Sequence, residues 1–303
     1  MTRSILPALA LLAAQLGCDP AFEPRSTLDG PRILALRADQ PELRVIASSD
    51  PAALTGSELV RVRLDALLHD AGQPFDEVRW DWCPLVISVD GRLKCEGEEL
   101  KAFVRVALGE DDQGAYLDVP RVFPDIAALL GPVIQAGDLP CAPPCELPDL
   151  KDGFTLHVWL TVHPGAGVRM PIHEAYKRIV VYDDPAREPN TNPVLRDVLV
   201  GGDAPDPSGR ADIEPGREHG IEADVDDSAL EPYVDAAGRG TTEEPFLSWF
   251  TSLGTITDSI TFGDPRSNAI DVPGTGGTGQ LFVVLRDGRG GVDWRVVDLS
   301  ATP

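Results

Sequence analysis

The chain has 303 residues, of which 43% are hydrophobic and 25% are charged. This composition excludes a chain that is disordered throughout or that crosses a membrane many times, and the length predicts about two domains. Asp and Glu number 49 against 26 Lys and Arg, giving a formal charge of −23. Such a surface argues against nucleic acids and anionic lipid headgroups as partners.

The N-terminus has the pattern of a secretory signal. Arg3 is the only charged side chain before an apolar run over residues 5–16, whose one polar member is Gln15. Twelve residues are too few for a membrane-spanning helix, which needs about 20, but they suit the apolar region of a signal. We therefore predict a signal peptide over residues 1–17.

The apolar run ends in Leu16-Gly17-Cys18, which resembles the lipobox of bacterial lipoproteins. The resemblance implies cleavage before Cys18 and acylation of both its thiol and the new amino terminus, with fatty acids such as palmitate. Two or more acyl chains anchor a protein where one chain binds only marginally. We expect a lipid-anchored envelope protein, in the outer membrane by preference, with its domains in the periplasm or at the cell surface. The alternative is an ordinary cleaved signal, with Cys18 free or in a disulfide.

Four cysteines remain after Cys18, namely Cys83, Cys95, Cys141 and Cys145. An even number in an exported chain predicts two disulfides. Local pairing of Cys83 with Cys95 and of Cys141 with Cys145 costs least in loop closure, and the first bond would contribute about 3 kcal/mol. The alternative is a four-thiolate zinc site, although the usual Cys-x-x-Cys pairs are absent.

A polar tether over residues 18–29 leads to a first domain, which we place at residues 30–184. Apolar residues alternate with polar ones in much of this range, which is typical of half-buried strands. We predict strands at residues 33–37, 59–67, 77–83, 154–162 and 175–182. Residues 125–130, between Pro124 and Gly131, predict a short helix, so the range of about 95–150 is interpreted as an insertion.

Residues 185–217 are rich in Pro, Asp and Gly, which predicts a linker, and residues 194–200 within it are predicted as the first strand of the next domain. The second domain is placed at residues 218–303. Short alternating runs predict strands at residues 221–225, 246–250, 259–262, 281–286 and 292–299. The last two flank Asp287-Gly-Arg-Gly-Gly291, which predicts a hairpin turn. The expected fold is all-β, with two β-sandwich domains, the first carrying the short-helix insertion.

Three motifs of the second domain resemble bacterial immunoglobulin-like and PKD-type repeats: Trp249 to Gly254, Pro273-Gly274, and residues 281–291 ending in Asp-Gly-x-Gly-Gly. The resemblance covers about residues 193–303 and implies an immunoglobulin-like sandwich with no catalytic residue. With the lipobox, the chain resembles envelope lipoproteins of GC-rich Gram-negative bacteria. The basic residues agree, because only four are lysine and arginine codons are GC-rich.

Candidate ligand sites are few. Clustered carboxylates at Glu222, Asp224, Asp226 and Asp227 could bind calcium, although a solvated acidic loop is the simpler interpretation. Trp80 and Trp82 face the same way, either as a sugar-stacking platform or, as we favour, in core packing. Residues 274–279 match G-x-G-x-x-G, but Pro273 precedes them and a strand follows, so we predict a loop without a nucleotide.

No histidine pair has metal-ligand spacing, and no nucleophile motif occurs, so we expect neither a cofactor nor an enzyme. His157 and His163 would share one strand face, which is more often structural than metal-binding. The predicted function is a structural or binding role in the envelope, with a protein or glycan partner and membrane attachment through Cys18. The alternatives are a calcium-dependent or glycan-binding adhesin and a secreted hydrolase with its site in residues 95–150.

Overall fold

The computed structural model describes residues 26–89, 92–96, 101–125, 150, 153–164, 173–227, 230–234, 239–263 and 266–302. Cys18, Cys141, Cys145, the predicted signal peptide and residues 126–130 of the predicted short helix lie outside these ranges. Within them, no helix has both the length and the apolar character needed to span a membrane.

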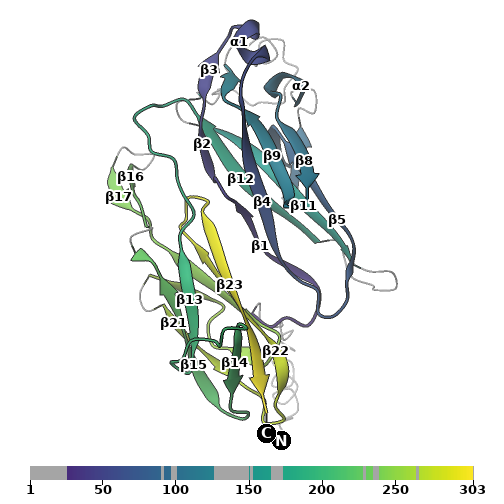
Figure 1. The fold of residues 1–303 in the computed structure, drawn as a ribbon, viewed down its shortest axis with the longest axis vertical. Coiled ribbons are helices and arrows are strands. Elements are labelled where there is room, and N and C mark those ends of the chain that lie inside the picture. Colours follow the sequence, from purple (N-terminus) through teal and green to yellow (C-terminus); the bar gives the residue numbers. More distant parts are fainter. Residues whose placement is uncertain are drawn as a thin grey trace, which may run out of the picture.

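The first domain is a sandwich of two four-stranded sheets (Figure 1). One sheet is antiparallel, in the order β1 (Arg32–Ala38), β4 (Leu59–His69), β9 (Gly114–Pro120), β8 (Ala107–Asp111). The other has the order β2 (Glu42–Arg44), β12 (His173–Tyr182), β11 (Phe154–Pro164), β5 (Phe75–Cys83). Only β2 runs parallel to its neighbour in this second sheet.

The second domain repeats this arrangement. One sheet has the order β13 (Leu195–Val200), β15 (Glu218–Val225), β21 (Ser267–Asp271), β19 (Thr255–Ile256). The other has the order β14 (Arg210–Ile213), β23 (Val292–Ala301), β22 (Gly277–Arg286), β18 (Phe246–Thr251), β20 (Ile260–Phe262). Among the named strands of this second sheet, only β14 pairs in parallel, and its partner is the last strand.

In both domains the chain starts in one sheet, crosses to the other and pairs there in parallel with the final strand. The remaining strands of each domain are divided between two sheets in which they pair antiparallel, which is the immunoglobulin-like plan. The prediction of two all-β, immunoglobulin-like sandwiches is therefore confirmed.

Each sandwich has its own core, formed by the inward positions of alternating strands. In the first domain, Leu117, Val158 and Ile179 are completely buried, and Trp82 packs among them. In the second, Trp249 is completely buried and donates from its indole N–H to Thr261 Oγ1 at 2.9 Å. The period-two burial is what the alternating sequence predicts for half-buried strands.

Two predicted boundaries differ from the structure. Part of the predicted insertion at residues 95–150 belongs to the sandwich, because β8 and β9 complete its first sheet and Val119 is completely buried. The apolar alternation of β9 is short and follows an acidic turn, so it does not stand out in the sequence. Within residues 185–217, assigned to a linker with one strand, the structure has both β13 and β14.

The other elements lie in the loops. Beside the first sandwich are α1 (Pro51–Thr55), α2 (Lys101–Val104), a parallel pair and a hairpin. The pair is β3 (Ile46–Ser48) with β10 (Val122–Pro124), and the hairpin is β6 (Leu85–Val89) with β7 (Arg92–Glu96). In the second domain, a hairpin of β16 (Pro232–Val234) and β17 (Gly240–Thr242) separates β15 from β18.

Candidate functional site

The described residues concentrate their unusual features where the two domains meet, with β1 lying alongside β23 (Figure 1). An apolar cluster joins them there, with partly buried Phe250 and Trp294 packed against it. The cluster comprises Leu28, Leu34, Ala35 and Leu67 from the first part of the chain and Phe282, Val284 and Val292 from the second domain. His69 adds an edge-on ring contact to Phe282, with centroids 5.5 Å apart. We call this interdomain contact, with the polar residues described next, the seam.

The first described residues cross to the second domain. Leu28 N donates to Thr251 O at 2.9 Å, and Thr251 N donates to Ser26 O at 2.8 Å. Thr27 and Thr251 form a parallel bridge, so this segment extends the sheet beside β18, beyond the part of β18 that pairs with β20. The chain therefore begins against the second domain and only then enters the first.

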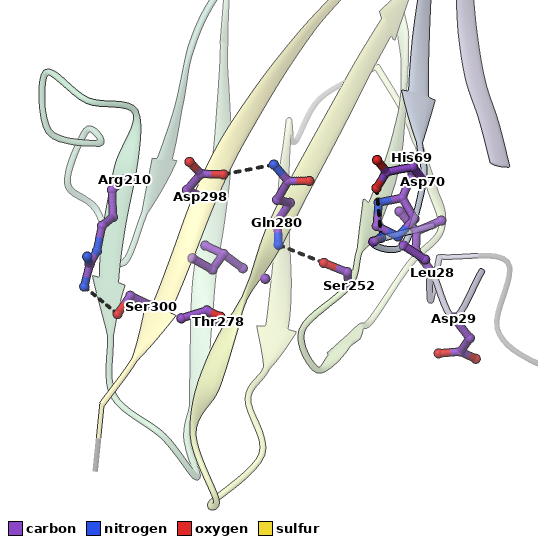
Figure 2. A pocket seen from close by; sticks show the side chains of 14 residues that line it. Leu28, Asp29, His69, Asp70, Arg210, Ser252, Thr278, Gln280, Asp298 and Ser300 are labelled. Carbon is purple, nitrogen blue, oxygen red and sulfur yellow. Dashed lines mark hydrogen bonds between the residues drawn. The ribbon is translucent and has the colours of Figure 1, made fainter. Parts of the chain in front are cut away.

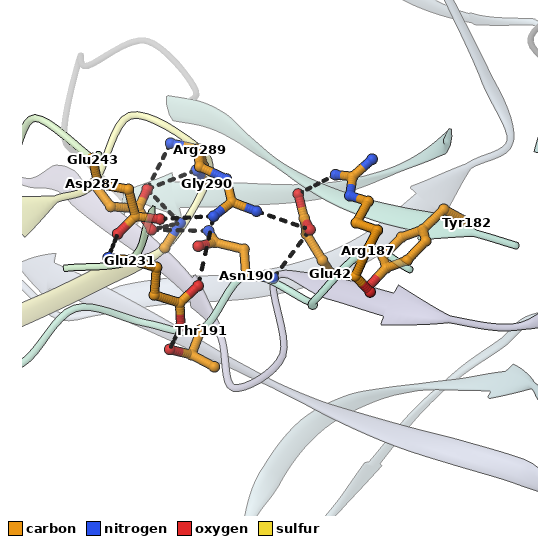
Figure 3. Close-up of polar contacts among 11 residues, drawn as sticks. Glu42, Tyr182, Arg187, Asn190, Thr191, Glu231, Glu243, Asp287, Arg289 and Gly290 are labelled. Carbon is orange, nitrogen blue, oxygen red and sulfur yellow. Dashed lines mark hydrogen bonds and ion pairs between the residues drawn. The ribbon is translucent and has the colours of Figure 1, made fainter. Parts of the chain in front are cut away.

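Glu42 is the first centre of a polar network at the seam (Figure 3). Its side chain is 4% exposed and accepts from Arg187 Nη2 at 2.6 Å and from Asn190 N at 3.0 Å. Arg289 Nη2, from the second domain, donates to the same carboxylate at 3.3 Å. The charge of Glu42 is thus held by one guanidinium from each side of the seam.

Arg289 is the second centre, and its guanidinium forms ion pairs with three carboxylates. Besides Glu42, its Nη1 reaches Glu243 Oε1 at 3.1 Å and Glu231 Oε2 at 3.5 Å. The guanidinium lies 4.7 Å from the ring centroid of Tyr233, in cation–π contact. Burial raises the pKa of Glu243, so its charged form depends on nearby donors and on Arg289.

Asp287 positions Arg289 by organising the turn between β22 and β23. It accepts from the backbone N–H groups of Arg289 at 2.7 Å and of Gly290 and Gly291 at 2.9 Å, and from Asn190 Nδ2 at 2.9 Å. A Cβ on Gly291 would lie 2.0 Å from Asp287 Oδ2, so the position requires glycine. The Asp-Gly-x-Gly-Gly sequence therefore forms the hairpin turn that was predicted and also part of the seam.

A second set of polar contacts lies along β1 and β23. Arg37 pairs with Asp293 at 2.8 Å and with Asp65 at 3.0 Å, and its guanidinium lies 4.3 Å from the Trp294 ring centroid. Asn192 donates to Ala38 O at 2.8 Å and accepts from Val292 N at 2.9 Å. Paired charges and satisfied amides on both sides favour one fixed arrangement of the domains.

A hollow of about 680 Å³ opens beside the seam at His69 (Figure 2). Its polar side chains bond mainly to one another: Gln280 Nε2 donates to Asp298 Oδ1 at 3.0 Å, and Arg210 Nη2 donates to Ser300 Oγ at 2.6 Å. Burial lowers the pKa of His69, which is therefore neutral at pH 7. His69 Nε2 is buried without a hydrogen-bond partner among the described residues, but a single unpartnered nitrogen is not a convergent binding set.

The sequence-predicted site residues have varied placements. Cys83 and Cys95 form a disulfide, which precludes their use as zinc thiolates, and Cys95 pairs in the ladder with Val86 and not with Cys83. Trp82 is buried in the core and Trp80 is half-buried against it, as core packing requires. Residues 274–276 form a turn leading into β22, so the G-x-G-x-x-G sequence is a loop and a strand.

Three of the four candidate calcium carboxylates, all except exposed Glu222, are engaged with arginines. Arg196 reaches Asp226 at 2.8 Å and Asp224 at 3.9 Å, and Arg266 pairs with Asp227. In the part of the chain that the structure describes, no three His, Cys, Asp or Glu side chains converge as a metal site. His157 and His163 lie six residues apart on β11, and burial lowers the pKa of His157.

The sequence did not predict the seam itself. Glu42 and Arg289 are 247 residues apart, and neither belongs to a motif with a known partner. The glycine-rich turn was the one visible signal, because three glycines after an aspartate indicate a turn that an aspartate carboxylate can cap. Nothing in that pattern predicts that the first domain supplies Glu42 to this turn.

No protein-family model matches the sequence, and no curated protein matches it. Among solved structures, the chain is similar to the two tandem V-type regions of VCBP3, a v-region-containing chitin binding protein. That match has 14% identity over 89% of this chain and 100% of the other, with a TM-score of 0.32. Another is the N-terminal Ig1-2 module of the Drosophila receptor protein tyrosine phosphatase DLAR, with 12% identity, 90% and 100% coverage and a TM-score of 0.25.

Fibronectin(III)-like modules of Clostridium thermocellum CbhA are also similar, with 7% identity, 90% and 94% coverage and a TM-score of 0.25. Identities and TM-scores at this level carry no argument about function. The immunoglobulin-like assignment rests on the strand order of each domain.

Proposed function

We propose that this chain is an exported, non-enzymatic binding module of the bacterial envelope, in which two immunoglobulin-like domains act as one rigid body. The observation that carries the proposal is the seam, where a buried polar network and an apolar cluster join the domains. A fixed arrangement of the two domains suits a module that presents a surface in one direction.

The beginning of the chain supports attachment through Cys18. Eight residue steps separate Cys18 from Ser26, so they span at most about 28 Å. Ser26 bonds to Thr251 of β18, and the C-terminus lies at the same end of the second domain (Figure 1). A lipid on Cys18 would therefore hold the second domain near the bilayer, with the first domain outermost.

Export is also supported by the disulfide between Cys83 and Cys95, because such bonds persist in oxidising compartments. Outer-membrane attachment and a protein or glycan partner complete the proposal. The acidic surface, with its charge of −23, favours partners other than nucleic acid.

Intact-mass analysis of the N-terminal peptide, from membrane and soluble fractions, tests the anchor. We expect a diacylglyceryl-modified Cys18 in the membrane fraction, and a soluble, unmodified chain for Cys18→Ser. A matched Cys83→Ser variant keeps the anchor and controls for loss of a cysteine elsewhere. An unmodified, soluble wild-type chain would refute the anchored role.

A further inference from the structure

A second cleft at the seam, of about 510 Å³, differs from the other hollows in its charge. It lies between β1 and β12 of the first domain and the turn at residues 288–291 of the second, and we call it the β12 cleft. Its volume falls within the usual range of ligand sites. The charged residues that line it are Lys177, Arg178 and Arg286, with no carboxylate among them.

An all-cationic cleft is unexpected in this protein, because acidic residues outnumber basic ones by 49 to 26. The His69 hollow and the hollow beside Arg266 both mix the two signs. Among the described residues, none of the three cations forms an ion pair. Arg286 instead donates to Ser248 Oγ at 2.8 Å and to Leu34 O at 3.1 Å.

Lys177 is a buried cation of this cleft. Lys177 is 6% exposed, and its ammonium group donates to Gly290 O. Its pKa is lowered to about 8, mainly by burial; Asp287 raises the pKa, and Arg286, Arg178 and Arg37 lower it. Asp287 is one carboxylate beside three cations of the cleft, so a net positive charge remains there. Buried cations that outnumber their counter-charges favour an incoming anion.

The cleft also exposes a strand edge. On one side β12 pairs with β11 from His173 to Val181, but on the other it pairs with β2 only from Val180 to Tyr182. β1 lies near that second side, but in the described part of the chain no strand forms ladder pairs with it at residues 174–178. A free edge is a template for an added strand, which would gain main-chain hydrogen bonds there.

The walls of the cleft suit alternate side chains of such a strand. Ile33, Leu36 and Phe246 supply apolar surface, and Tyr176 lies at the cleft with 51% of its surface exposed. Successive side chains of an added strand point to opposite sides. If acidic and apolar residues alternate in that strand, its acidic side chains would contact the cations and its apolar side chains would contact these apolar groups.

We propose that the β12 cleft receives an extended, acidic peptide segment of a partner protein, which pairs with the free edge of β12 and places its carboxylates beside the cations of the cleft. This inference rests on the proposed binding role but not on the anchor at Cys18. The partner is expected to contain a strand-forming segment in which acidic and apolar residues alternate.

Titration calorimetry on the soluble Cys18→Ser chain tests the proposal with three capped peptides. The first alternates Glu and Val, the second replaces Glu by Gln, and the third has the first sequence with alternate backbone nitrogens methylated. We expect the first peptide to bind at least about tenfold more tightly than either of the others, because each lacks one class of interaction. Equal binding of the first two peptides, or no binding up to about 1 mM, would overturn the proposal.

A pair of variants locates the site. Arg178→Gln removes an exposed cation of the cleft and should weaken binding about five- to tenfold. Arg79→Gln is the matched control, because Arg79 is also exposed and unpaired among the described residues but lies on β5, away from the cleft. Equal effects of the two variants would contradict the assignment. Tighter binding of a polygalacturonate oligomer, lost in Arg178→Gln, would replace the peptide with an anionic glycan. Because every arm uses the soluble chain, these outcomes are independent of the mass analysis of Cys18.

Discussion

Replacing Arg289 by methionine removes the cation on which the seam depends and keeps much of the side-chain volume. Three carboxylates lose a partner, and two of them are nearly inaccessible, with the Glu42 and Glu243 side chains 4% and 1% exposed. Breaking a buried ion pair from one side leaves an uncompensated charge and costs about 3–5 kcal/mol. Glu42 keeps Arg187, so we expect a loss near the lower end, about 3 kcal/mol in the free energy of unfolding.

The loss should depend on pH in a defined direction. The pKa of Glu243 is already raised by burial, and removing Arg289 raises it further. A carboxyl with a raised pKa in the folded state binds a proton more readily than in the unfolded chain, so folding is favoured as pH falls. The deficit of Arg289→Met relative to wild type should therefore shrink between pH 7.5 and pH 5.

Urea unfolding followed by tryptophan fluorescence measures both quantities. Arg217→Met is the matched control, because Arg217 is 70% exposed and pairs only with exposed Glu214, so its loss should leave the midpoint unchanged. Adding Glu243→Gln to Arg289→Met should recover part of the loss. A deficit below about 1 kcal/mol, or one that grows as pH falls, would refute the claim that the network stabilises the seam.

Three other predictions concern single features. Gly279→Ala should lower the free energy of unfolding, measured in urea, by about 1–3 kcal/mol, because its Cβ would lie 2.6 Å from the side chain of Leu253. A Cβ at Gly220 meets nothing within 4 Å, so Gly220→Ala should be tolerated, and equal losses for the two variants would contradict the prediction. The free energy of unfolding of wild type should rise relative to that of Lys177→Met between about pH 8 and 10.5, by up to about 3 kcal/mol. The reason is that the folded state favours the neutral amine of Lys177, whereas the unfolded chain keeps it protonated up to higher pH. A difference between the two proteins that does not change with pH in their denaturation curves would contradict the prediction. Replacing both Cys83 and Cys95 by alanine should lower the urea midpoint, with a loss of about 3 kcal/mol, and an unchanged midpoint would show that the bond adds no stability.

The sequence predicted the strands whose apolar alternation is long. β4, β11 and β12 each bury every second residue over most of their length, and all three were expected close to their observed positions. Short strands were missed. β2 and β14 have three and four residues, and their positions come from parallel pairing with the last strand of each domain, which no local pattern encodes.

The seam was beyond sequence reasoning for a different reason. Glu42, Asn190 and Arg289 come from three distant parts of the chain, and each has the appearance of an ordinary surface polar residue. Glu42 and Asn190 are buried in the folded chain, where Arg289 and Asp287 of the second domain bond to them. The same holds for the β12 cleft, because Lys177, Arg178 and Arg286 are unremarkable until β12 and β22 are brought together.

The central claim is that the seam joins the two domains into one cooperative body. Differential scanning calorimetry of the soluble Cys18→Ser chain tests it most directly, because independent domains melt separately. We expect a single endotherm for this chain, with calorimetric and van't Hoff enthalpies in agreement, and two separated endotherms when Arg289→Met is added. Two endotherms before that substitution is made would contradict the claim.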